Sequence, residues 1–476
     1  MKLIYNVKDK PRFGQLIVFA IQQLLAIMAA TLVVPVITGH GMSSAAALFG
    51  AGIGTLVYVL FTKAKSPVFL GSSFAFLGSM ASAFAGATSM QLGYVGLILG
   101  AVFTGLVYVI IAIVVKLVGV NWINKLMPAV VIGPTVAIIG LSLSGNAIGD
   151  LTKGSVTKTI TDTVAVIGEN GLPALVEQES QVSVANPLIT ILCGLVTLAV
   201  TMLCATFGKK MLRLIPFIMG ILAGYVTALI FTFIGKAADV EALMVLNTAP
   251  LEALVADGIT LKTFFSVPDF TFLTAVKGLS ELNGTYIAAI AVAYIPVAFV
   301  VFAEHIADHK NISSIIETDL LDDPGLSRTL LGDGVGSMAG AFFGGCPNTT
   351  YGESVGCVAI TGNASVVTII AAAIGAMLIS FINPFVAFVN SIPSCVMGGV
   401  CVALYGFIAV SGLKMIQKVN LEANKNLFVV SAILIAGIGG LTVTFGKVTI
   451  TSIACALILG ILANIMLAKG EDKPQE

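Results

Sequence analysis

GGCPNTTYGESVGCVAITG, residues 344–362, interrupts an otherwise hydrophobic chain. Glycine, proline and hydroxyl-bearing residues replace the leucines and isoleucines on either side, and one carboxylate, Glu353, stands in the middle. In a lipid bilayer every backbone N–H and C=O needs a partner, so non-helical chain persists only where protein covers it or where it lines a cavity. An interrupted span that contains a carboxylate is typical of the binding site of a secondary transporter.

The composition is that of a membrane protein. Of 476 residues, 57% are hydrophobic and 10% are charged, whereas a soluble domain carries roughly 25% charged residues. We therefore expect an all-α polytopic membrane protein. The formal net charge is zero, so nothing indicates a nucleic-acid partner.

The cysteine, histidine and serine residues, which could bind a metal or act as nucleophiles, form no pattern typical of a metal site or an enzyme. The cysteines show no CxxC and no Cys/His metal spacing, and we interpret them as small buried hydrophobic residues; they are Cys193, Cys204, Cys346, Cys357, Cys395, Cys401 and Cys455. His305 and His309 flank the helix face that carries Glu304, but their positions turn them away from it. We predict no metal, no cofactor and no Ser/His/Asp catalysis.

Apolar runs of about 20 residues, the length that crosses a bilayer, recur along the whole chain. Fourteen candidates, two of them short or broken, cover residues 14–37, 44–62, 67–88, 92–115, 127–146, 187–207, 213–235, 285–304, 328–345, 346–363, 364–384, 393–412, 425–445 and 448–468. The polar, basic N-terminus leads into the first span and shows no cleavable signal peptide.

The distribution of lysine and arginine orients these spans. With the N-terminus inside, only six of the 24 lysines and arginines fall in outside segments, most of them in the long loops at 146–186 and 236–284; the six are Lys153, Lys158, Lys236, Lys262, Lys277 and Lys447. Because cytoplasmic segments carry the excess of positive charge, both termini are predicted to be cytoplasmic.

A weak internal repeat indicates how the spans are organised. Residues 127–140 resemble 392–406, and each copy has a proline followed five residues later by a glycine. The copies open the fifth and the twelfth span, which are seven spans apart. Because successive spans alternate in direction and seven is an odd number, the two copies have opposite orientations, as in an inverted repeat. The broken spans at 67–76 and 347–356 share this offset. The alternative is that proline and glycine are simply common in transmembrane helices.

Four carboxylates in or beside the spans are candidates for function, because intramembrane ionisable groups are rare. Glu304 ends an apolar run, and Asp308, four residues later, lies on the same helix face. Glu353 lies in the broken tenth span, and Asp333 lies in a glycine-rich stretch. The alternatives are a helix-end carboxylate in interfacial water for Glu304 and cap or turn residues for the two aspartates.

Five motifs together resemble the nucleobase–ascorbate transporter family, and within it the uracil-type bacterial members. They are FAEHIADH (302–309), DPGLSRTLLGDG (323–334), PNTTYGESVGCVAITG (347–362), PVFLGSSFAF (67–76) and QQLLAIMAATLVVP (22–35). The resemblance implies fourteen spans in two inverted repeats of seven, with short strands in spans three and ten that meet at the site. It implies core domains at 14–118 and 285–384 and gate domains at 119–236 and 385–468.

The resemblance also assigns site residues. It implies that Glu304 and Glu353 bind the substrate, that Phe74, Ala30, Tyr351 and Gly352 line the site, and that Asp308, Glu304 and Asp333 couple transport to protons. It further implies a homodimer formed through the gate domains, surrounded by membrane lipid, in the bacterial plasma membrane. The expected function is import of uracil by proton symport.

Some positions depart from the family pattern and keep a second substrate class open. Ser354 stands where asparagine is usual, and Gln22–Gln23 replaces a Gln-His pair. Asp308 stands where uracil carriers often have histidine and purine carriers often have aspartate. The alternative is therefore a xanthine or urate permease of the same family. An anion transporter of the same plan is disfavoured by the central carboxylates, and an embedded enzyme by the missing nucleophile–base pair.

Overall fold

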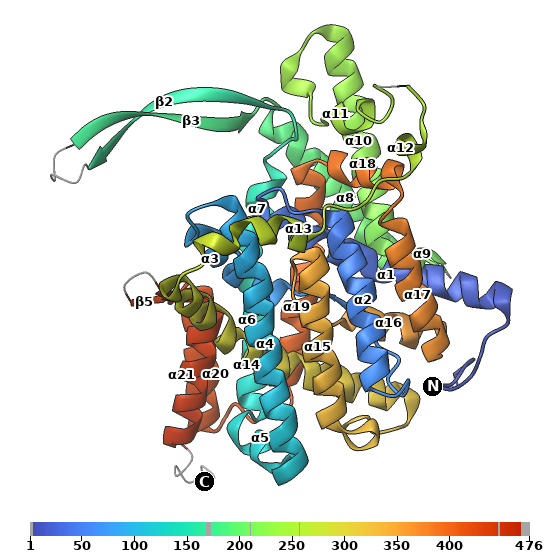
Figure 1. The fold of residues 1–476 in the computed structure, drawn as a ribbon, viewed down its shortest axis with the longest axis vertical. Coiled ribbons are helices and arrows are strands. Elements are labelled where there is room, and N and C mark those ends of the chain that lie inside the picture. The colour runs from blue at the N-terminus through green and yellow to red at the C-terminus, as the bar shows by residue number, and fades with distance from the viewer. Residues whose placement is uncertain (1–2, 168–172, 210, 257, 446–447, 468–476) are drawn as a thin grey trace. The chain divides into compact units, whose positions relative to one another are not determined.

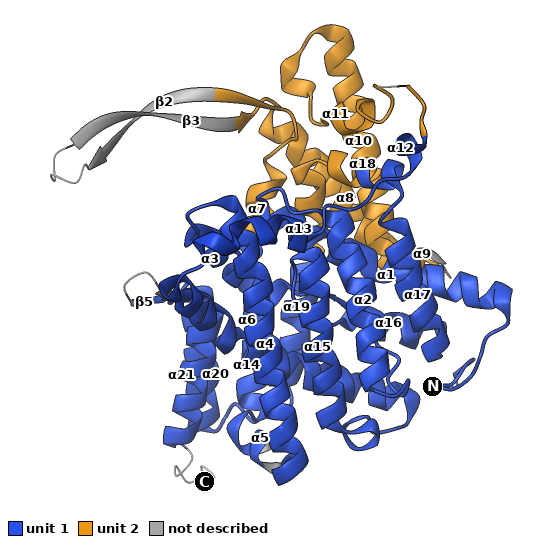
Figure 2. Cartoon of the chain, viewed as in Figure 1, with its two compact units in different colours: residues 1–144, 261–386, 404–476 blue, residues 145–260, 387–403 orange. Residues whose placement is uncertain are grey.

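The computed structural model describes residues 3–167, 173–209, 211–256, 258–445 and 448–467 (Figure 1). Five cations on which the predicted orientation rests lie outside the described residues, namely Lys2, Lys210, Lys447, Lys469 and Lys473. The chain divides into two compact units (Figure 2). Unit 1 comprises residues 1–144, 261–386 and 404–476, and unit 2 comprises residues 145–260 and 387–403.

Unit 1 is built from helices that alternate with very short strands. Its elements are α1 (Phe13–Thr38), α2 (Ser44–Phe61), β1 (Leu70–Ser72), α3 (Leu77–Ala85), α4 (Met90–Val118), α5 (Asn121–Leu126), α6 (Ala129–Ser142), α12 (Leu261–Phe264), α13 (Thr271–Ala275), α14 (Gly284–Ile316), α15 (Leu326–Gly344), β4 (Asn348–Thr350), α16 (Gly352–Thr361), α17 (Val366–Ile379), α20 (Asn424–Ile438), β5 (Val443–Phe445), β6 (Val448–Ile450) and α21 (Ser452–Met466). Local sequence starts several of these helices, because the side chains of Ser43, Ser89 and Asn283 accept hydrogen bonds from the first turns of α2, α4 and α14.

Glycines let the helices at the centre of unit 1 approach closely. The helices α2 and α15 lie side by side (Figure 1), with Gly54 on the first facing Gly336 on the second. A Cβ added to Gly54 would lie 2.8 Å from Gly336 O, and one added to Gly336 would lie 2.7 Å from Gly54 O. Small residues bring helix backbones together where lipid supplies no hydrophobic driving force, so this pair forms a rigid wall beside the strands.

The strands β1 and β4 join segments that are far apart in the sequence. They pair antiparallel with the register Leu70↔Thr350, Gly71↔Thr349 and Ser72↔Asn348. Both strands are buried on every residue, and their pairing gives backbone groups hydrogen-bond partners inside the protein, as a bilayer requires. The predicted short strands in the third and tenth spans are therefore present, and they meet.

Unit 2 contains a long hairpin and a helix pair. Its elements are α7 (Ser144–Leu151, whose first residue belongs to unit 1), β2 (Thr157–Ile167), β3 (Pro173–Ser183), α8 (Pro187–Phe207), α9 (Met211–Leu214), α10 (Pro216–Ala238) and α11 (Ala249–Glu252). The helices α18 (Asn383–Ser391) and α19 (Ser394–Ile416) contribute residues to both units. Within unit 2, α8 packs against α10, and Tyr225 Oη lies 2.8 Å from Ser391 Oγ. From the sequence, residues 146–186 are expected to form an outside loop. The β2–β3 hairpin within this range was not predicted.

Within the described residues, eight helices are long and apolar enough to cross a membrane: α1, α2, α4, α6 continued by α7, α8, α10, α14 and α19. Shorter apolar helices run over Phe74–Ala85, Val366–Ile379, Asn424–Ile438 and Ser452–Met466. Each of these four shorter helices coincides with a span predicted from the sequence. The chain is thus a multi-pass membrane protein, as the composition predicts.

One predicted boundary is wrong in a way that matters for the site. The apolar span expected at 285–304 is part of a longer helix, α14, which continues to Ile316, so Glu304 lies inside the helix and the alternative of a helix-end carboxylate is wrong. The extension is stable because His305, Asp308, His309 and Ile312 recur at helical spacing and are buried. Hydropathy alone does not reveal the last turns of this helix because their buried face is polar.

Candidate functional site

The paired strands place two helix N-termini beside each other. A 3-10 turn, Phe74–Phe76, follows β1 and leads into α3, and α16 begins at Gly352 directly after β4 and Tyr351. Tyr351 makes no side-chain cap on α16, so the first N–H groups of that helix have no partner within it. Such N-termini offer N–H donors and the positive end of a helix dipole to a ligand.

Three of the predicted carboxylates come together at this point. Glu304 and Asp308 of α14 and Glu353 of α16 lie close enough to interact electrostatically. Asp308 is buried and accepts a hydrogen bond from Thr350 Oγ1 at 2.9 Å. Glu304 and Glu353 are partly exposed, and Gly352 is exposed. The two glutamates therefore combine burial with access, as a binding carboxylate requires.

Asp333 lies on α15 and contacts a histidine instead of the open part of the site. Its Oδ2 lies 2.6 Å from Nδ1 of His305, and both side chains are fully buried. His305 Nε2 lies 3.0 Å from Thr329 Oγ1, whose own proton is donated to Leu326 O. Nε2 must therefore be the donor to Thr329, which leaves one proton between His305 Nδ1 and Asp333 Oδ2. The pair is neutral overall wherever that proton resides.

A second buried histidine continues this polar cluster. His309 Nδ1 donates to the carbonyl of His305 at 2.7 Å, and its Nε2 lies 2.6 Å from Tyr58 Oη on α2. Tyr58 in turn lies 2.7 Å from Ser66 Oγ, and the two imidazole rings stack with centroids 3.9 Å apart. The histidines point away from the Glu304 face, as predicted, but the sequence analysis missed this network. Their spacing of four residues on a buried helix face is the signal that was available.

Ser354 holds the first turn of α16 in place. Its Oγ accepts hydrogen bonds from Gln23 Nε2 on α1 at 2.5 Å and from the backbone N–H of Phe69 at 3.0 Å. Both Gln23 and Ser354 are buried. The hydroxyl adjacent to Glu353 thus connects α16 with α1 and with the segment that enters β1. Two positions that depart from the family pattern contact each other here.

Removing this hydroxyl is expected to destabilise the site. Ser354→Ala leaves the Phe69 N–H and the Gln23 amide without their acceptor, and each unsatisfied buried donor costs about 1–3 kcal/mol. We expect a lower thermal unfolding temperature for the purified variant than for wild type. Ser82→Ala is the matched control, because the Ser82 hydroxyl bonds only to Gly78 of its own helix. Equal unfolding temperatures for the two variants would contradict the assignment.

The remaining predicted lining residues are well packed. Phe74 and Ala30 are 6% and 1% exposed, and Phe74 meets Tyr405 edge to face with ring centroids 5.5 Å apart. Tyr351 donates its hydroxyl proton to Ser72 O at 2.6 Å. Any contact of Tyr351 with a substrate therefore involves the ring or the lone pairs of its oxygen.

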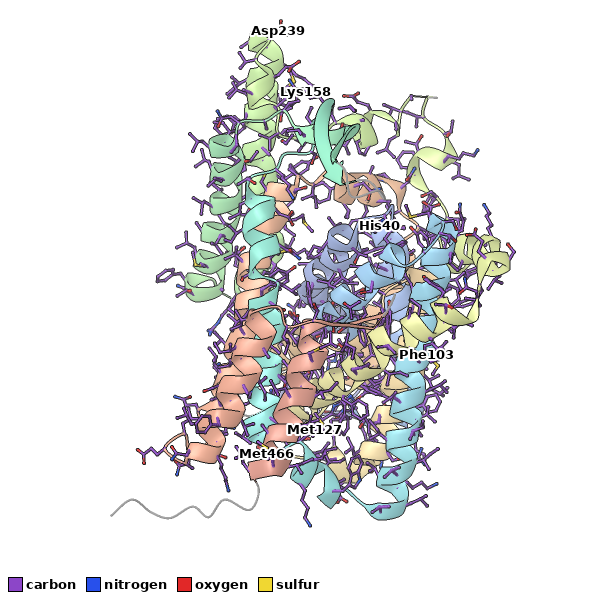
Figure 3. All side chains as sticks on the ribbon, turned by 90° about the vertical axis from the view of Figure 1, so that its left-hand side faces the viewer. His40, Phe103, Met127, Lys158, Asp239 and Met466 are labelled. Atoms are coloured by element: carbon purple, nitrogen blue, oxygen red, sulfur yellow. The ribbon has the colours of Figure 1, made fainter. Side chains whose placement is uncertain are left out.

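A cavity begins one helical turn beyond Glu304. It has a volume of about 80 Å³ and is lined by Ile123, Met127, Pro128, Ala129, Ile132, Ile306, Ala307, Lys310 and Met415. Figure 3 shows Met127 at the end of unit 1 that carries Met466, away from His40. In the predicted orientation this end is cytoplasmic. In the described part of the chain, no group of three or more His, Cys, Asp or Glu could hold a metal ion.

Comparison with known sequences gives consistent results over the whole length. A sequence model of the Permease family matches residues 14–167 and 146–446. The uracil permease of Bacillus subtilis is 35% identical over 476 residues, covering 99% of this chain and 97% of its own length. The uracil permease of Escherichia coli K12 is 33% identical and covers 96% of this chain and 92% of its own length.

Comparison with solved structures identifies the fold. The transmembrane domain of the cyanobacterial bicarbonate transporter BicA superposes with a TM-score of 0.60 at 14% identity, covering 96% of this chain and 99% of that domain. The murine anion transporter Slc26a9 superposes with a TM-score of 0.60 at 10% identity, covering 97% of this chain and 69% of that one. At these identities the likeness concerns the fold alone.

Proposed function

This chain belongs to the Permease family, within the nucleobase–ascorbate transporters, and on that premise we propose that it imports uracil across the bacterial plasma membrane by proton symport. The family membership makes it a transporter and not an enzyme. The observation that carries the substrate proposal is the position of Glu353. This partly exposed carboxylate lies in the first turn of α16, directly after β4 and next to Glu304 and Asp308 of α14.

The chemistry of the site matches a small, neutral, planar base. Uracil offers two N–H donors and two carbonyl acceptors. A carboxyl group accepts hydrogen bonds when it is ionised and, through its carbonyl oxygen, when it is protonated, so Glu304 and Glu353 each take one N–H. The backbone N–H groups at Gly352 and Glu353 serve a carbonyl, with help from the helix dipole. Phe74 covers one face of the ring, and Ala30 and Tyr351 close the remaining sides.

Competition between bases tests the substrate. Unlabelled uracil is expected to abolish uptake of radiolabelled uracil into cells that lack their own carrier, whereas xanthine and urate leave it unchanged. The second candidate is a purine permease, favoured by one observation, the aspartate at position 308. Uptake of a labelled purine that uracil does not inhibit would replace the first proposal by the second.

Proton coupling is assigned to Asp308, Glu304 and Asp333. Burial favours the protonated form of a carboxyl group, as does a second carboxylate nearby. Protonation of Asp308 or Glu304 on one side of the membrane then favours binding of the substrate and movement of the loaded core. Asp333 shares one proton with His305 behind this pair, and its Oδ1 is buried without a hydrogen-bond partner among the described residues.

Asp308→Asn is expected to separate exchange from accumulation. The amide keeps the polar contact to Thr350 but carries no exchangeable charge. Uracil is expected to equilibrate across proteoliposomes preloaded with unlabelled uracil, whereas accumulation driven by an inward proton gradient falls about 10-fold or more, the effect of about 1.4 kcal/mol. A variant that still accumulates uracil like wild type would remove Asp308 from the coupling set.

The finer architecture is part of the proposal. Fourteen spans in two inverted repeats are supported by the antiparallel β1–β4 pair. They are supported as well by α6 and α19, which both begin directly after the prolines of the repeat, Pro128 and Pro393. Core domains at 14–118 and 285–384, gate domains at 119–236 and 385–468, cytoplasmic termini and a homodimer through the gate domains complete it. Cysteine labelling of single positions near Lys10 and Lys277 from either side tests the orientation.

The likeness to anion transporters does not extend to the substrate. Anion sites use unpaired positive charge or helix dipoles without carboxylates, whereas Glu304, Asp308 and Glu353 converge here. Bicarbonate or chloride uptake that survives in the absence of any base would reverse this argument.

A further inference from the structure

The segment 261–267, LKTFFSV, follows a long connection between spans and contains the four-residue helix α12. The segment belongs to the long loop predicted to lie outside at 236–284, in which no residue indicates a ligand. In the structure it has two different faces, one fixed to unit 1 and one without cover from the described residues.

The inner face of the 261–267 segment is fixed by hydrogen bonds to the end of α17. The backbone N–H of Ser266 donates to Phe381 O at 3.0 Å, and Phe265 forms an antiparallel bridge with Ile382. The side chain of Asn383 donates to Lys262 O at 2.8 Å, and Ser266 Oγ donates to Asn383 Oδ1 at 3.2 Å. These contacts give the segment a defined position at the end of a span.

Phe270 anchors the chain just beyond the segment. Its ring lies 4.9 Å from that of Phe49, 5.5 Å from that of Phe343 and 6.4 Å from that of Phe381. Thr263 is buried as well, with 8% of its surface exposed. These hydrogen bonds and ring contacts fix one face of the 261–267 segment against unit 1. They therefore determine which of its side chains lie on the opposite, exposed face.

The outer face consists of large apolar side chains. Leu261 is 77% exposed, Phe264 48%, Phe265 58% and Val267 68%. Four such residues within seven positions form a contiguous apolar surface of a kind that a protein rarely leaves in water. Lys262 stands exposed among them.

This surface continues an exposed apolar stripe on a helix that coincides with a predicted span. Ile374 and Leu378 on α17 are 46% and 64% exposed and lie four residues apart, on one face of a helix that coincides with a predicted span. Ile382, 38% exposed, comes next in the same direction and is the bridge partner of Phe265. The apolar stripe thus passes from the span to the segment without a break, at the level where the span ends.

We propose that the 261–267 segment lies in the bilayer interface, with Leu261, Phe264, Phe265 and Val267 inserted at the boundary between headgroups and acyl chains. Lys262 then extends its ammonium group to the phosphates, as cationic side chains do beside interfacial apolar faces. The segment anchors the corner formed by α17 and α18 to the membrane surface.

Tryptophan fluorescence tests this proposal in the full-length chain. The protein has one tryptophan, so Trp122→Phe supplies a silent background into which Phe265→Trp is introduced. The protein is reconstituted into phosphatidylcholine vesicles with bromine at different depths of the acyl chain. We expect bromine near the glycerol level to lower the emission about two-fold, bromine near the chain end to act less, and aqueous iodide to act weakly. Val267→Trp provides an independent probe if Phe265→Trp fails to fold.

The matched control is Glu241→Trp in the same background, since Glu241 is exposed on another connecting segment. Its emission is expected to respond to iodide and not to bromolipid. Strong iodide quenching at position 265 without bromolipid quenching would overturn the proposal. Protection from both quenchers that increases with the protein-to-lipid ratio would also overturn it, because a second copy of the chain would then cover the segment.

Discussion

Glu353→Gln is expected to lower the rate of uracil uptake about 100-fold at limiting substrate. The substitution preserves shape but replaces a charged acceptor by an amide, and a hydrogen bond to a charged group contributes about 1.5–3 kcal/mol, which is about 10- to 150-fold in affinity or rate. The effect is at the upper end because Glu353 lies in the first turn of α16, where the substrate carbonyl and the carboxylate must fit together.

Uptake of labelled uracil by cells that express equal amounts of each variant measures this loss. Glu422→Gln, an exposed glutamate in the connection before α20, is the control and is expected to behave like wild type. If Glu353→Gln transports uracil at the wild-type rate, Glu353 is not a substrate ligand and the proposed site is wrong.

Asp333→Ala is expected to destabilise unit 1. It removes the partner of His305 Nδ1 in a fully buried pair. Leaving the buried Nδ1 without its hydrogen-bond partner costs about 1–3 kcal/mol, a substantial share of the roughly 5–15 kcal/mol that holds a folded protein together. Thermal unfolding of the purified carrier in detergent measures the change.

A double variant tests whether the loss of stability in Asp333→Ala comes from the unpaired His305 side chain. When Asp333→Leu is combined with His305→Leu, no unpaired polar group remains at these positions, and replacement of both partners by apolar residues is often nearly neutral. The double variant is therefore expected to unfold at a higher temperature than Asp333→Ala. If Asp333→Ala alone unfolds like wild type, the pair does not support the fold.

Patterns confined to a short stretch of sequence predicted much of this molecule. Apolar runs located the membrane helices, and the polar stretches at 67–76 and 347–356 located the two broken spans. Each of these signals acts within a few residues, so the sequence displays it directly.

Contacts between distant segments were not predictable in the same way. His309 meets Tyr58, and Ser354 meets Gln23, across separations that no local pattern encodes. The end of α14 was misplaced for a related reason. Its last turns are polar in sequence and are buried only because α2 and α15 supply hydrogen-bond partners for His305 and His309.

Uracil accumulation in proteoliposomes tests the central claim most directly. The purified carrier is reconstituted, an inward proton gradient is imposed, and the internal concentration of radiolabelled uracil is followed with and without a protonophore. The account predicts accumulation above the external concentration that collapses when the protonophore is added. Uracil that never exceeds the external concentration under the gradient, or that enters no faster than in empty liposomes, would contradict it.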